Sequence, residues 1–146
     1  MDHWLSEDFC RILKYHKVIF DGNDILGAYI ETEEHRNDNK IFVGRYVILT
    51  KEYVIILHYV RETQFIKITK INRKNIISVD KELFLDYRTD DWNQKTPMNE
   101  YKKATITTLN SELYDFLIPE LDKEHYFNYD FIEKNVSRYN DLIDKL

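Results

Sequence analysis

The sequence is poor in three residues that many kinds of site require. Its 146 residues include 3 glycines, 2 prolines and 1 cysteine. So few glycines make a backbone loop that wraps phosphates hard to build, and one cysteine supports neither an internal disulfide nor a thiolate metal cluster. We therefore expect no nucleotide hydrolysis and no redox chemistry, and a reducing compartment suits this composition.

Long apolar runs are also missing. No run approaches the roughly 20 residues that span a bilayer, and the opening Met1-Asp2-His3-Trp4 lacks a basic region followed by an apolar stretch. The motifs G-x-S-x-G, H-E-x-x-H and C-x-x-C do not occur either. These observations predict a cytoplasmic, non-catalytic protein without a cofactor or a metal.

Potential ligand and nucleophile side chains are scattered along the chain. The five histidines are His3, His16, His35, His58 and His125. No two stand at a spacing of two or four residues, which would place both rings on one local face. The densest ligand group is Glu31, Glu33 and Glu34 with His35, which we interpret as the solvated edge of a loop. We interpret His58 as a core or edge histidine of an apolar strand and Cys10 as a small buried hydrophobe.

The residues that are abundant predict a folded chain with uneven charge. Hydrophobic residues make up 43% and charged residues 32%, and there are 11 Tyr and 8 Phe, which is typical of one globular domain. The net charge of −5 disfavours a general nucleic-acid binder. The charge is −4 over residues 1–40, +4 over 41–88 and −5 over 89–146. A basic middle third therefore stands between two acidic flanks.

The middle of the chain has the pattern of antiparallel strands. β-branched and aromatic residues are dense there, and short polar turns separate the runs. We expect strands over residues 25–32, 41–50, 53–60, 65–71 and 76–87, and a last hairpin over 104–109 and 113–118. Residues 31–40 and 89–101 are expected to be loops, and the latter is the longest stretch without periodicity.

Helices are predicted at the two ends of the chain. Ser6 resembles a helix cap, and apolar residues recur at helical spacing over residues 4–15. A turn is expected at 21–24. From Tyr129 an apolar stripe runs through Phe131, Ile132, Val136, Tyr139, Leu142, Ile143 and Leu146. We interpret this stripe as the core-facing side of a C-terminal helix.

These elements predict one α+β domain that is mainly β. We expect an N-terminal helical extension over residues 1–20, a bent antiparallel sheet or partly open barrel over 25–118 and a helical region over 122–146. The strands at residues 44–50, 53–57, 65–68 and 75–79, followed by the 106–109 hairpin and the terminal helix, resemble bacterial pleckstrin-homology-like and GRAM domains. This resemblance implies a nearly closed barrel plugged by the helix, and binding rather than catalysis. Family members that bind phosphoinositides use basic residues in and beside the loop after the first strand, which here is the acidic segment 31–40.

The leading hypothesis is a protein-interaction domain that uses the predicted loop at 89–101. Trp92, Met98 and Tyr101 are the expected anchors, because aromatic side chains contribute disproportionately to interface energy. Asp90 and Asp91 are expected beside them in the same loop.

A second hypothesis is the binding of an anionic lipid or membrane surface through the basic middle third. The expected residues are Arg61, Lys67, Lys70, Arg73 and Lys74. RNA is a weaker ligand for the same patch, since aromatic residues are not interleaved with the basic ones.

A third hypothesis uses the acidic last third of the chain. Asp115, Glu120, Asp122 and Glu124 would face a basic partner. The chain would then be a small acidic inhibitor or regulator of a host macromolecule, encoded by a phage or another mobile element.

Overall fold

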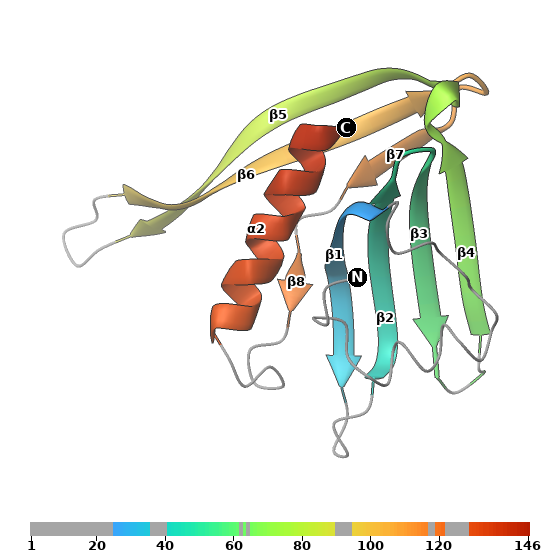
Figure 1. Cartoon of the computed structure of the whole chain (residues 1–146). Coiled ribbons are helices and arrows are strands. Elements are labelled where there is room, and N and C mark those ends of the chain that lie inside the picture. The colour runs from blue at the N-terminus through green and yellow to red at the C-terminus, as the bar shows by residue number, and fades with distance from the viewer. Residues whose placement is uncertain are drawn as a thin grey trace.

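The computed structural model describes residues 25–35, 41–61, 63, 65–89, 95–116, 119–121 and 129–146. Most of these residues lie in two β-sheets, and one long helix follows them in the chain (Figure 1). The chain is therefore mainly β with a C-terminal helix, as the sequence predicts. The strands do not form one continuous hydrogen-bonded sheet.

The first sheet has five strands in the order β4-β3-β2-β1-β8. The strands are β1 (Ile25–His35), β2 (Ile41–Thr50), β3 (Tyr53–Val60), β4 (Phe65–Asn72) and β8 (Glu120–Leu121). Neighbours among β1 to β4 are antiparallel, whereas the short β8 runs parallel to β1. Two-residue turns suffice for antiparallel neighbours, and Lys51-Glu52 joins β2 to β3.

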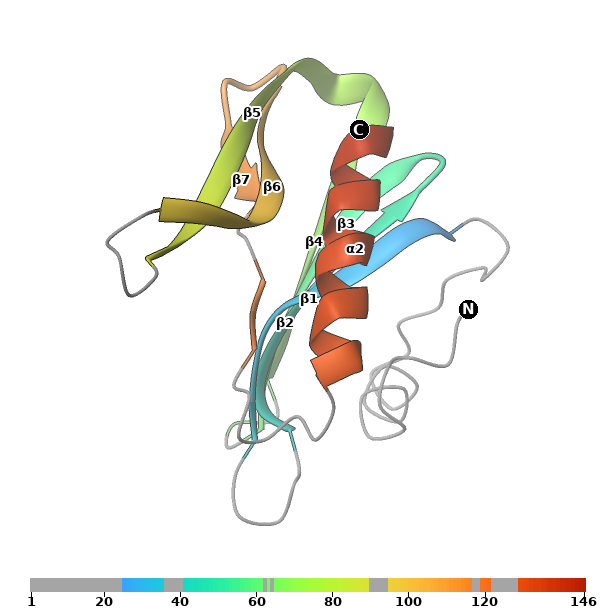
Figure 2. The same cartoon turned by 90° about the vertical axis from the view of Figure 1, so that its left-hand side faces the viewer.

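The second sheet has three antiparallel strands in the order β5-β6-β7. They are β5 (Ile76–Thr89), β6 (Lys95–Thr108) and β7 (Leu113–Phe116). The short helix η2 (Arg73–Asn75) makes the corner between the sheets, and the Asn72 side chain caps it by accepting a 3.0 Å bond from the Lys74 amide. At this corner the chain leaves the first sheet, and the second sheet crosses over one end of it (Figures 1 and 2).

The helix α2 (Tyr129–Lys145) lies beside β1 and also touches β6. Tyr139, Leu142 and Ile143 are fully buried, at the spacing of one helical face. The rings of Tyr139 and Tyr29 meet edge to face, with centroids 5.0 Å apart and planes at 77°, a favoured aromatic geometry. The predicted helix and the core role of its apolar stripe are confirmed at these three residues.

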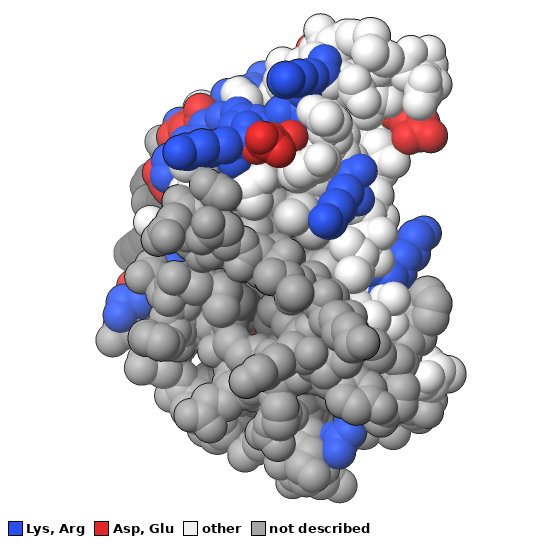
Figure 3. Space-filling model, turned by 45° about the vertical axis from the view of Figure 1, so that its right-hand side comes forward, with Lys and Arg blue, Asp and Glu red and all other residues white. Residues whose placement is uncertain are grey.

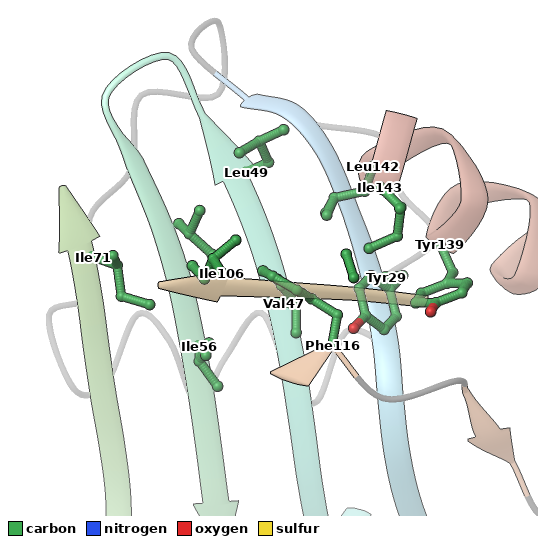
Figure 4. Close-up of a cluster of buried hydrophobic side chains, with 12 residues drawn as sticks. Tyr29, Val47, Leu49, Ile56, Ile71, Ile106, Phe116, Tyr139, Leu142 and Ile143 are labelled. Atoms are coloured by element: carbon green, nitrogen blue, oxygen red, sulfur yellow. The ribbon is translucent and has the colours of Figure 1, made fainter. Parts of the chain in front are cut away.

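One hydrophobic core joins the two sheets and the helix (Figure 4). Its buried members are Tyr29, Val47, Leu49, Val54, Ile56 and Ile71 from the first sheet, Ala104, Ile106 and Phe116 from the second, and Tyr139, Leu142 and Ile143 from α2. Burying a large apolar side chain completely stabilises a fold by about 1.5–3 kcal/mol. This core therefore fixes the sheets against each other.

The first sheet also buries side chains on its other face. They alternate with the core residues along each strand and comprise Ile30, Tyr46, Ile48, Ile55, Leu57 and Tyr59. None of them is more than 5% exposed. Burial on both faces explains why β2 and β3 have nearly continuous apolar sequences instead of an alternating pattern.

Asn135 holds α2 against the backbone of β1. Its side chain is fully buried. The Asn135 amide nitrogen donates to the Ile30 carbonyl and its oxygen accepts from the Ile30 amide, both at 2.8 Å. One carboxamide thus satisfies two backbone groups of a strand edge, as a neighbouring strand would.

Two loop predictions were wrong. β1 continues through residues 31–35, which were expected to belong to a loop. The β5 and β6 strands extend to Thr89 and from Lys95, so most of the expected 89–101 loop is a hairpin. Both errors arose because polar and charged residues occupy strand positions. The predicted helix at 4–15 and the turn at 21–24 lie outside the described residues.

Candidate functional site

The expected contact loop at 89–101 is the end of a long hairpin. β5 and β6 pair from Ile76 opposite Thr108 to Thr89 opposite Lys95. β7 pairs only with residues 104–107 of β6. Residues 83–89 and 95–101 therefore form a two-stranded arm that extends past α2 (Figure 1).

The expected contact residues divide between this arm and the segment that joins its strands. Met98 and Tyr101 belong to β6, and Tyr101 pairs in register with Phe84 of β5. Their side chains lie outside the described part of the chain, as do Asp90, Asp91 and Trp92 altogether. The arm places the predicted anchors on or next to a projecting hairpin.

Exposed apolar side chains gather on the second sheet. Among the described residues, the large hydrophobics that remain exposed are Ile68, Ile77, Leu83, Leu109 and Leu113. Four of these five belong to β5, β7 or the turn between β6 and β7. Only Ile68 lies on the first sheet, on β4.

Three of these residues occupy one end of the second sheet, which we call the apolar corner: Ile77, Leu109 and Leu113. They are 60%, 63% and 67% exposed. Ile77 is skipped in the register between β5 and β6, and the Leu109 amide donates a 2.8 Å bond to the Asn75 carbonyl. Leu113 pairs with Thr107, whose other neighbour is Ser78. The three residues thus lie on neighbouring strands and the adjoining turn, and exposed apolar side chains grouped in this way are common at protein interfaces.

The five basic residues that were expected to bind an anion do not form one patch. Lys67 pairs with His58 and Lys70 pairs with Ile55, so the two lysines lie on opposite faces of the first sheet. Lys74 is exposed on η2, and Arg61 is half-buried after β3. Sequence proximity fails here because side chains alternate between faces along a strand.

Arg73 is committed to the fold instead of to a ligand. Its guanidinium donates to the Thr50 carbonyl at 3.2 Å and to the Lys145 carbonyl at 3.0 Å. A cation at the C-terminal end of a helix is stabilised by the free carbonyls there. Arg73 therefore ties the end of α2 to the corner between the sheets.

A different group of basic side chains lies in register across the first sheet. Arg45 of β2 pairs with His58 of β3, which pairs with Lys67 of β4. Thr32 of β1 is opposite Arg45 and is exposed. We call these three basic side chains the cationic row (Arg45, His58 and Lys67). Arg45 and Lys67 carry positive charge on the same face of the sheet, so the row is a candidate site for an anion. Of the three, only Lys67 was expected from the sequence.

Glu31 balances one end of the cationic row. Its carboxylate lies 3.2 Å from Nε of Arg45, and Glu31 is only 3% exposed. Burial, followed by the charge of Glu31, raises the pKa of Tyr29 well above its usual value and that of Tyr139 to about 12. Both phenols therefore stay neutral at physiological pH beside a carboxylate that Arg45 compensates.

The other acidic residues and the histidine singled out in the sequence differ in burial and position. Glu31 and Glu33 of β1 are buried, not solvated as expected, whereas Glu34 of the same strand is exposed. His58 is half-buried in β3. Asp115 is exposed on β7 and accepts a hydrogen bond from Thr105, whereas Asp122, Glu124 and Cys10 lie outside the described residues.

Within the ranges given above, no group of three or more His, Cys, Asp or Glu side chains is arranged to hold a metal ion. No helix in that part of the chain has both the length and the apolar character that crossing a membrane requires.

Comparison of the whole chain with models of protein families, with curated proteins and with solved structures finds no match.

Sequence reasoning missed Arg45 and Asn135, and it placed Glu31 on a solvated loop edge. Arg45 stands in an apolar run and Glu31 in a polar one, so the local sequence around either residue does not predict their ion pair. The register skips Glu31 between the Ile30–Tyr46 and Thr32–Arg45 pairs, a bulge that re-aims a side chain. Asn135 offered one usable signal: it lies four residues before Tyr139, on the same helical face.

Proposed function

We propose that this chain is a non-catalytic pleckstrin-homology-like binding domain that docks a protein partner on its second sheet. The order of four antiparallel strands, three further strands and a packed helix supports the fold assignment. The concentration of exposed hydrophobics on one sheet carries the functional proposal.

The docking surface has two parts. The apolar corner supplies three exposed aliphatic side chains near η2. The arm, at the other end of the same hairpin, offers the backbone of β5 and β6 beyond the core and carries exposed Leu83. Interfaces place apolar anchors at their centre, and we assign this role to the corner.

Site-specific photocrosslinking in the source cell tests the docking surface. A benzoylphenylalanine at Leu113 should give a discrete adduct with another protein, because that side chain is 67% exposed on the apolar corner. The same photoreactive residue at Glu133, exposed on α2, is the matched control. An adduct at both positions, or at neither, would contradict docking on the corner.

A second pair of variants asks which part of the surface contributes. Leu109→Glu should abolish the Leu113 adduct if the partner covers the corner. Trp92→Ala should weaken the adduct only if the partner also reaches the end of the arm. An adduct that survives Leu109→Glu shows that the corner is not the contact.

Anion binding by the cationic row is a second candidate function. Its support is the register of Arg45, His58 and Lys67, which places three basic side chains side by side. Sedimentation with anionic vesicles and titration with inorganic phosphate would separate a lipid head group from a free anion. Lys67→Glu should reduce binding several-fold, whereas Lys74→Glu, which makes the same charge change off the row, should not.

A further inference from the structure

The two edges of the first sheet differ in whether their backbone groups are hydrogen-bonded to another part of the chain. On the β1 side, β8 pairs with Thr32 and Glu33, and the Asn135 side chain bonds both backbone groups of Ile30. On the β4 side, no strand of the described part of the chain pairs beyond β4. Among the described residues, this edge of eight residues is therefore open, and an open strand edge is a ready template for another strand.

The β4 edge carries two lysines and no carboxylate. No Asp or Glu occurs from Thr63 to Val79, and Lys67 and Lys70 belong to β4 itself. Lys67 and Lys70 are exposed, and Ile68 between them is 39% exposed. In the view that brings the β4 side forward, basic side chains stand on uncharged surface in the described region, and acidic side chains show at upper left and at the upper right edge (Figure 3).

The charges on β4 indicate which kind of partner strand this edge favours. A second copy of this chain joining through β4 would place Lys67 and Lys70 of both copies along one shared edge, and edge lysines oppose such self-pairing. An acidic strand meets the opposite charge at both positions. Charge complementarity therefore selects an acidic, extended peptide.

We propose that the β4 edge binds an extended acidic segment of another protein by strand addition. The bound strand runs antiparallel to β4, which continues the pattern of β1 to β4. Lys67 and Lys70 are three residues apart and on opposite faces, so the segment carries two acids three residues apart. An apolar residue two positions after the first acid lies opposite Ile68. This site is distinct from the second-sheet surface proposed above.

Fluorescence anisotropy with a labelled peptide, Ser-Thr-Glu-Thr-Val-Glu-Thr-Ser, tests the proposal on the full chain. Lys70→Glu should weaken binding roughly tenfold, because it replaces an attraction by a repulsion. Lys74→Glu is the matched control, since it changes the net charge equally just beyond the strand, and it should change binding less than about twofold. Equal losses in both variants, or no binding at millimolar protein, would overturn the proposal.

Two further probes separate strand addition from simple charge attraction. Two versions of the peptide are made, one N-methylated at the odd-numbered amides and the other at the even-numbered amides. In an added strand only one of these two sets of amides points toward β4 and donates hydrogen bonds to it. One set should therefore abolish binding while the other retains it, and binding by both sets would overturn strand addition. A peptide with Lys at both Glu positions should bind Lys70→Glu better than it binds the natural chain, which also shows that the variant is folded. Failure here leaves the photocrosslinking at Leu113 unaffected, so the two proposals are judged separately.

Discussion

The two sheets of this molecule use their apolar residues differently. The first sheet buries them on both faces, with Leu49 on the core side and Leu57 on the other. The second sheet buries Ala104, Ile106 and Phe116 on its core side and leaves Leu113 exposed. The first sheet thus serves mainly stability, whereas the second has apolar surface available for a partner.

The largest expected effects test whether both faces of the first sheet are equally structural. Leu49→Ala and Leu57→Ala should each lower the free energy of unfolding by about 2–5 kcal/mol, because both side chains are fully buried. Urea denaturation with a constant m-value measures the change. A loss below about 1 kcal/mol for Leu57→Ala alone would show that the face of the first sheet away from the core contributes little to stability, contrary to our interpretation.

Removal of the Asn135 side chain should be the next largest effect. Asn135→Ala leaves a buried amide and a buried carbonyl of Ile30 without partners, and each costs about 1–3 kcal/mol. Asn140→Ala on the same helix is the control, because it removes a bond to the Lys102 amide that is exposed. Similar losses in the two variants would show that burial of the Ile30 contact does not matter.

Alkaline pH should destabilise the joint between the first sheet and α2. The pKa of Tyr139 is raised from its ordinary value of 10.0 to about 12, so above pH 10 the unfolded chain loses a proton that the folded chain retains. The contribution of Tyr139 to the free energy of unfolding should be fully present below pH 10 and should fall by roughly 2 kcal/mol as pH rises to 12. Denaturation of Tyr139→Phe across this range should show a shallower decline, and an equal slope would exclude Tyr139 as a source.

A smaller effect is expected at Gly44 of β2. A Cβ at this position would come within 2.6 Å of the ring of Tyr46, which is buried and has little room to move. Gly44→Ala should therefore cost about 1–3 kcal/mol by overpacking. Gly27→Ala is the comparison, since its Cβ would meet Leu142 at an ordinary 3.5 Å. A greater loss at Gly27 would contradict the packing argument.

The smallest expected change sharpens the contrast between the sheets. Leu113→Ala should alter the free energy of unfolding by less than about 0.5 kcal/mol, because the side chain is mostly exposed. The same variant should still weaken the partner contact in a binding assay. A loss of stability comparable to that of Leu49→Ala would mean that the apolar corner supports the fold.

Pattern alone predicted the parts of the fold that depend on periodicity. β2, β3 and α2 are confirmed because dense β-branched residues or a helical apolar stripe admit one interpretation. Residues 31–35 and 95–101 were assigned to loops because charge and proline suggest solvent. Their strand partners are close in sequence, at residues 41–45 and 84–89. Hairpin pairing with these neighbours therefore overrode the polar local preference of both segments.

The candidate sites were harder to predict than the fold. Lys67 was identified, but its neighbours Arg45 and His58 become neighbours only through the pairing of three strands. Arg73 looked like part of a ligand patch, yet the carbonyl of Lys145 that it binds is 72 residues away. A site assembled across strands requires a register, which composition does not supply.

The Asn135 contact has a consequence for how this chain avoids aggregation. While α2 is docked, the backbone of Ile30 is occupied and cannot join a foreign strand. If the helix detaches, the same motion opens the core and uncovers that length of β1. Partial unfolding at the C-terminus would then present an apolar template for cross-β growth. We therefore expect α2 to protect the chain from aggregation in addition to completing the core.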